Sequence, residues 1–82
     1  MEKSKVIAEE ARLLSKVKAG QVVCLVSITA GQMLQTRLTS MGLLPGTMLE
    51  VVKNSEHGPV VILVKGSRLM LGRGMSSKIL VT

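Results

Sequence analysis

The sequence predicts a mainly β fold: a small closed or half-closed barrel of about five strands, with one helix inserted between the first and second strands. Two observations support this prediction. Short apolar or alternating segments recur along the chain, and brief turns rich in glycine and proline separate them. Only one internal segment, near 30–41, repeats its apolar residues at helical spacing. Closure of the sheet would also protect the edges of such apolar strands.

The first strand is expected at 22–28, after a turn at 17–20. Both faces of this strand are largely apolar, which is typical of a central strand that is covered on both sides. The helix that follows is expected from about Ala30 to Met41, with Thr29 as its N-cap.

The end of this helix is the most informative stretch of the chain. Leu34, Leu38 and Met41 share one helical face. Gly42 then supplies the left-handed residue that commonly ends a helix, because glycine has no Cβ to clash. If Gly42 is residue C′, Leu38 and Leu43 are the positions that touch across a Schellman motif.

Two tight turns fix the expected strand positions. Pro45 and Gly46 fit the centre of a type II turn that leads into the second strand at 48–54. Gly66 and Ser67 are expected to form a two-residue type II′ hairpin. The other expected elements are a loop at 54–59, strands at 60–65, 68–71 and 78–82, and a short helical turn within 72–77.

The chain is expected to hold one domain at 14–82, preceded by a helix-prone N-terminal extension at 1–13. The start lacks the apolar core of a signal peptide. No apolar run approaches the ~20 residues that a membrane span needs. We therefore expect a cytoplasmic protein.

The composition excludes several kinds of binding site. Hydrophobic residues make up 46 % of the chain, but Phe, Tyr and Trp are absent. The chain therefore has no aromatic platform for single-stranded nucleic acid and no aromatic groove for polyproline. The net charge is +6, but the lysines and arginines are scattered. This charge indicates either a solvated basic surface or a patch that steers an acidic partner.

The sequence gives little support for catalysis or for a metal site. A single Cys24 in an apolar strand is expected to act as a small buried hydrophobe. His57 lies in a turn beside Glu56, without a recognisable nucleophile or ligand spacing. No phosphate-binding glycine loop is present. We expect no enzyme activity, no cofactor and no metal ligands.

Several motifs give the chain a resemblance to a known family. They are Leu-Ser-Lys-Val-Lys-Ala-Gly at 14–20, Arg-Leu-x-x-Met-Gly-Leu-x-Pro-Gly-Thr at 37–47, Gly-Pro-Val at 58–60, and Lys-Gly-x-x-x-x-Leu at 65–71. In these motifs the chain resembles the FeoA family, the small cytosolic proteins of bacterial ferrous iron transport. The resemblance implies an SH3-like β-barrel, no enzyme activity, and docking on the cytoplasmic part of the membrane permease FeoB.

Docking on a protein partner is the function that the sequence favours. The candidate surface is the helix with its cap, because methionine adapts to partner surfaces and arginine is enriched at interfaces. A basic pair near the last hairpin is a second candidate. The residues concerned are Met33, Arg37, Met41 and Leu43 for the helix, and Arg68 and Arg73 for the pair.

Two other functions stay open at this point. The same fold occurs in metal-dependent repressors, so a metal- or ligand-sensing domain is one alternative. A weak nucleic-acid-binding module is the other, motivated by the charge of +6. We expect no nucleic acid partner, contact with a membrane only through the permease, and a homodimer as an option allowed by free strand edges.

Overall fold

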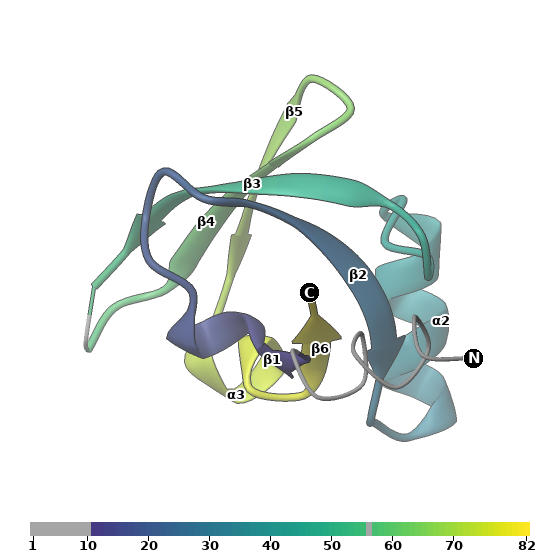
Figure 1. The fold of residues 1–82 in the computed structure, drawn as a ribbon. Coiled ribbons are helices and arrows are strands. Elements are labelled where there is room, and N and C mark those ends of the chain that lie inside the picture. The colour runs from purple at the N-terminus through teal and green to yellow at the C-terminus, as the bar shows by residue number, and fades with distance from the viewer. Residues whose placement is uncertain (1–10, 56) are drawn as a thin grey trace.

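The computed structural model describes residues 11–55 and 57–82 (Figure 1). Their six strands form one antiparallel sheet in the order β1-β6-β2-β3-β4-β5. The strands are β1 (Arg12–Leu13), β2 (Val22–Ile28), β3 (Met48–Asn54), β4 (Val60–Val64), β5 (Ser67–Leu71) and β6 (Ile79–Val81). The helices are η1 (Leu14–Lys16), α2 (Gln32–Ser40) and α3 (Arg73–Ser76).

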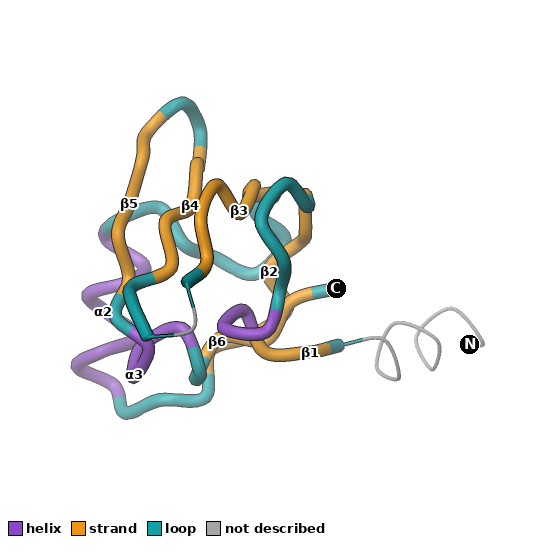
Figure 2. The backbone as a smooth tube through the Cα atoms, turned by 90° about the vertical axis from the view of Figure 1, so that its left-hand side faces the viewer, coloured by secondary structure: helices purple, strands orange, loops and turns teal. Residues whose placement is uncertain are grey.

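The mainly β fold with a helix between the first two long strands is therefore confirmed. The first half of β2 pairs with β3, and its second half pairs with β6, so β2 joins the two parts of the curved sheet. Figure 2 shows β5, β4, β3 and β2 following one another across the larger part. Among the described residues, β1 and β5 are the ends of this order, so the sheet does not close on itself.

The core lies on the concave side of the sheet. Along β3, for example, Leu49 and Val51 are buried while Met48 faces outward, as the two-residue period of a strand requires. The same alternation runs along β2, whereas in β4 Val60, Ile62 and Val64 belong to the core and Val61 on the other face is also buried. The buried cluster consists of Leu14, Val17, Val23, Leu25, Leu38, Leu43, Leu49, Val51, Val60, Ile62, Val64, Leu71, Ile79 and Val81.

The cap of α2 has the geometry that the sequence predicts. Gly42 has φ +94°, the Leu43 N–H donates to the Leu38 carbonyl (3.0 Å), and the Gly42 N–H donates to the Thr39 carbonyl (2.9 Å). These two bonds define a Schellman motif, and Leu38 and Leu43 are both fully buried. The helix is thus stopped and fastened to the core at one point.

The helix begins two residues later than expected, and Thr29 is not its N-cap. Gly31 occupies that position without a side-chain cap. Thr29 instead donates two hydrogen bonds to the Lys78 carbonyl, one from its N–H (2.7 Å) and one from its hydroxyl (3.1 Å). The Gln35 amide secures the helix start by donating to the carbonyls of Ile28 (3.1 Å) and Ala30 (2.9 Å).

The type II turn at Pro45–Gly46 is confirmed. The Thr47 N–H donates to the Leu44 carbonyl (3.0 Å), and Gly46 has φ +91°. The turn is also tied to β2, because the Gly46 N–H donates to the Leu25 carbonyl (2.7 Å). The chain therefore passes from the helix to β3 along one fixed path.

The predicted type II′ turn at Gly66–Ser67 is wrong by one residue. The two loop residues are Lys65 and Gly66, with φ +50° and +81°, and Val64 pairs with Ser67. Positive φ at both central positions is the type I′ geometry, which matches the twist of the flanking strands. The strand register, rather than the preference of Lys65 for negative φ, decides the turn.

The N-terminal prediction falls largely outside the described residues, which begin at Ala11. Arg12 and Leu13, which the sequence places in the extension, form β1 and pair with Val81 and Leu80. The expected short helical turn within 72–77 is present as α3.

We predict that Gly42→Ala lowers the free energy of unfolding by about 1–2 kcal/mol, the cost of a left-handed residue with a Cβ. A Cβ at this position meets no atom within 4 Å, so backbone strain is the whole effect. Gly74→Ala is the matched control, because Gly74 has equal space and no positive φ. Urea unfolding followed by circular dichroism measures both variants, and equal stability of the two would contradict the strain argument.

Candidate docking surface

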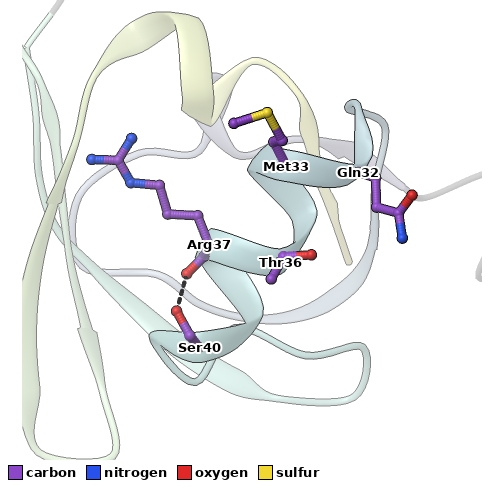
Figure 3. Close-up of a pocket in the computed structure, with 5 residues that line it drawn as sticks. All are labelled: Gln32, Met33, Thr36, Arg37 and Ser40. Atoms are coloured by element: carbon purple, nitrogen blue, oxygen red, sulfur yellow. Dashed lines mark hydrogen bonds between the residues drawn. The ribbon is translucent and has the colours of Figure 1, made fainter.

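The exposed face of α2 forms a shallow hollow of about 530 Å³, which is lined by Gln32, Met33, Thr36, Arg37 and Ser40 (Figure 3). Helical periodicity explains this face. Leu34 and Leu38 turn toward the core, so the five residues that line the hollow lie on the sides of the helix that turn away from it. Met33 is 88 % exposed, and Met33 and Arg37 extend from the same side of the helix. Ser40 donates to the Arg37 carbonyl (2.7 Å).

Two of the predicted docking residues belong to the core side of this helix. Leu43 is fully buried, because the Schellman motif draws it against Leu38. The expectation that Leu43 presents apolar surface to a partner is therefore wrong. Met41 is half-buried and packs against the core cluster, as its shared face with Leu34 and Leu38 predicts.

Arg68 and Arg73 do not form a common basic patch. Arg68 is exposed on the outer face of β5. Arg73 begins α3, and its guanidinium is directed into the fold. The two arginines thus have different roles, although they lie only five positions apart in the sequence.

Arg73 joins three segments that lie far apart in the chain. Its Nη1 donates to Asn54 Oδ1 (3.1 Å) and to the carbonyls of Ser55 and Gly58 (2.9 Å for Gly58). Its Nη2 donates to the Ser15 carbonyl (3.0 Å). The guanidinium therefore fixes η1 and the β3–β4 connection against α3, and Figure 1 shows η1 and α3 side by side. The prediction that Arg73 is a free basic residue for a partner is therefore wrong, because its guanidinium is used in hydrogen bonds within the domain.

Asn54 completes this cluster and was missed by the sequence analysis. Its amide donates to the carbonyls of Ser15 (3.0 Å) and Val17 (2.7 Å). Asn54 reaches the inner side because Val52 is an extra residue in β3: Val51 pairs with Ile62, but Lys53 already pairs with Val61. A one-residue shift moves a side chain to the other face of a sheet, so the bulge is the reason that Asn54 lies on the inner face.

The sequence could have indicated more of the helix face than it did. Thr36 lies three residues after Met33 and Ser40 lies three residues after Arg37, so the same helical spacing selects them. No comparable local signal marks Asn54, because a bulge is set by the pairing of β3 with β4.

The structure brings no metal-binding group together within the residues that it describes: no cluster of three or more His, Cys, Asp and Glu side chains occurs there. Cys24 is half-buried in β2 rather than fully buried, and His57 is exposed in the loop before β4. In the same part of the chain, no helix is long and apolar enough to cross a membrane.

Comparison with known proteins gives consistent matches over nearly the whole chain. A family model for the FeoA domain matches residues 12–82. A protein of Methanocaldococcus jannaschii that is named as an Fe(2+) transport protein A is 43 % identical over 68 residues, which cover 83 % of this chain and 82 % of that protein.

Solved structures share the same fold. A crystal structure of an iron uptake regulatory protein, FeoA, superposes with a TM-score of 0.82 at 32 % identity, covering 87 % of this chain and 95 % of that one. A manganese-dependent transcriptional repressor also superposes with a TM-score of 0.82, at 21 % identity, and the match covers 89 % of this chain and 41 % of the repressor. This second likeness shows a common fold alone.

We predict that Arg73→Ala lowers the free energy of unfolding by about 2–3 kcal/mol, because the carbonyls and Asn54 lose a charged donor. Arg73→Lys keeps the charge but not the planar fork, so it should recover only part of that loss. The control is Arg37→Ala, an exposed helix position where the change should stay within about 0.5 kcal/mol. Urea unfolding by circular dichroism suits this chain, which lacks aromatic residues. Equal stability of the two alanine variants would overturn the structural role of Arg73.

Proposed function

The chain belongs to the FeoA family, which is associated with ferrous iron transport, and on this basis we propose that it is a non-catalytic accessory protein that docks on the cytoplasmic part of the permease FeoB. The docking surface in this proposal is the exposed face of α2. The observation that carries it is the pairing of a strongly exposed Met33 with Arg37 on one side of that helix.

The fastening of α2 supports this choice of surface. The Gln35 amide holds the helix start, and the Schellman motif with the type II turn holds its end. A helix that is fixed at both ends presents its outer side chains without a large ordering cost when a partner binds. Met33 can adjust its shape to the partner, while Arg37 supplies charge and hydrogen-bond donors.

The charge of the domain supports an acidic partner surface. Residues 12–82 contain nine lysines and arginines but only Glu50 and Glu56 as acids. An excess of this size raises the rate of encounter with an acidic surface and suppresses encounter with a basic one. The proposal therefore places an acidic patch of the permease opposite α2.

We predict that Arg37→Glu weakens binding to the purified cytoplasmic domain of FeoB about tenfold or more, since a repulsive charge replaces an interface arginine. Titration of the ¹⁵N-labelled chain with that domain, followed by NMR, measures both the affinity and the residues that respond. Amide shifts should concentrate in α2. Met33→Ser should also weaken binding, through lost apolar contact.

Lys18→Glu is the matched control, because it makes the same charge change at an exposed position away from α2. It should reduce affinity much less than Arg37→Glu, by an amount that disappears as salt is added. Equal effects of the two variants would mean that binding depends on the overall charge of the chain and not on the α2 surface. Absence of any binding to the domain or to the full permease would reject the docking function.

A further inference from the structure

The outer face of the sheet carries more apolar surface than a solvated face requires. An antiparallel sheet with one face on the core normally has polar side chains on the other face. Here Val22, Met48 and Met70 are 60 %, 58 % and 70 % exposed, and they come from three different strands. Cys24 and Leu63 add half-buried apolar atoms to the same side.

The strand register arranges part of this face as a row across four strands. Val22 pairs with Glu50, Glu50 with Leu63, and Leu63 with Arg68, from β2, β3, β4 and β5 in turn. Figure 2 allows the order of these strands to be followed. Since neighbouring strands lie about 4.8 Å apart, Glu50 and Arg68 stand at about equal distances on either side of Leu63.

The next row continues this arrangement. Val61 pairs with Lys53 on one side and with Met70 on the other, and the bulge residue Val52 lies beside Lys53. The aliphatic part of a lysine can cover apolar surface while its amine stays in water. Both rows are therefore centred on an apolar residue of β4: the first on the half-buried Leu63, and the second on Val61, which is only 9 % exposed.

We propose that this face binds a second copy of the same chain, with the two sheets packed face to face around a two-fold axis that runs along β4. That axis places Leu63 against Leu63 of the second copy. It also places Glu50 of each copy opposite Arg68 of the other, so that symmetry forms the charge pair twice. In the adjacent row, Met70 of each copy meets Val52 and Lys53 of the other.

Charge complementarity is the reason to choose a second copy as the occupant. Glu50 is one of only two acids in 12–82, and it lies in the same row as Arg68, on the other side of the apolar centre. A row that holds both charges in this order is complementary to itself. The face is distinct from the α2 surface, so the dimer does not depend on the proposed docking function.

Sedimentation equilibrium with interference optics tests the dimer, because the chain has no aromatic absorbance. The wild-type chain is measured from about 10 µM to 1 mM at 150 mM salt, where the repulsion from a net charge of +6 is screened beyond about 8 Å. We expect reversible dimerisation. Glu50→Arg alone and Arg68→Glu alone should each weaken it at least tenfold, since like charges then face each other.

The decisive measurement is a mixture of the two single variants. Each of them alone repels itself, but Glu50→Arg opposite Arg68→Glu restores both charge pairs in a mixed dimer. Association in the mixture at near wild-type strength supports the proposal, and a folding defect cannot produce that result. Lys18→Glu, at an exposed position in the loop before β2, should leave self-association unchanged.

A monomeric wild-type chain up to 1 mM, or a mixture that stays monomeric while the wild type associates, would overturn the proposal. The proposal would also be overturned if titration with the permease domain shifted the NMR signals of residues on this face and Arg68→Glu abolished those shifts. This face would then bind the permease and not a second copy of the chain.

Discussion

The guanidinium of Arg73 is the contact on which the arrangement of this small domain depends most. It donates to Ser15, Asn54 and Gly58, which belong to η1, the end of β3 and the loop before β4. All of these acceptors are neutral oxygens, so the charge is held by carbonyl and amide dipoles. In a chain whose core is made only of aliphatic residues, this polar cluster fixes positions that non-directional apolar packing leaves free.

The two surfaces proposed for binding follow from this internal order. The Schellman motif at Gly42 and the turn at Pro45–Gly46 use the backbone to fix α2, which leaves its outer side chains free for a partner. On the sheet, the pairing of β3, β4 and β5 sets which side chains stand in one row. The first surface serves the proposed docking on FeoB, and the second serves self-association, so both can be occupied in one assembly.

Prediction from the sequence succeeded where a short segment is enough to decide the conformation. Gly42 and Gly46 were predicted at positive φ from their immediate neighbours, and both have it. It failed where pairing between distant segments of the chain decides the conformation. Lys65 takes φ +50° because the strands on either side require a type I′ turn, and Thr29 bonds Lys78 instead of capping α2. Arg73 and Arg68 look alike in sequence, but only their surroundings separate a structural arginine from an exposed one.

The sequence by itself determined the fold class, the position and C-terminal cap of the helix, and the resemblance to the FeoA family, because these depend on periodicity and local backbone preference. Only the tertiary structure decided that Arg73 is internal and that Asn54 faces inward. Each of these depends on a contact between residues that lie far apart in the sequence. Asn54 also depends on the bulge in β3, which turns the side chain at the end of this strand to the other face of the sheet. Local chemistry sets the conformation of each turn, but the pairing of the strands decides which side chains reach the surface.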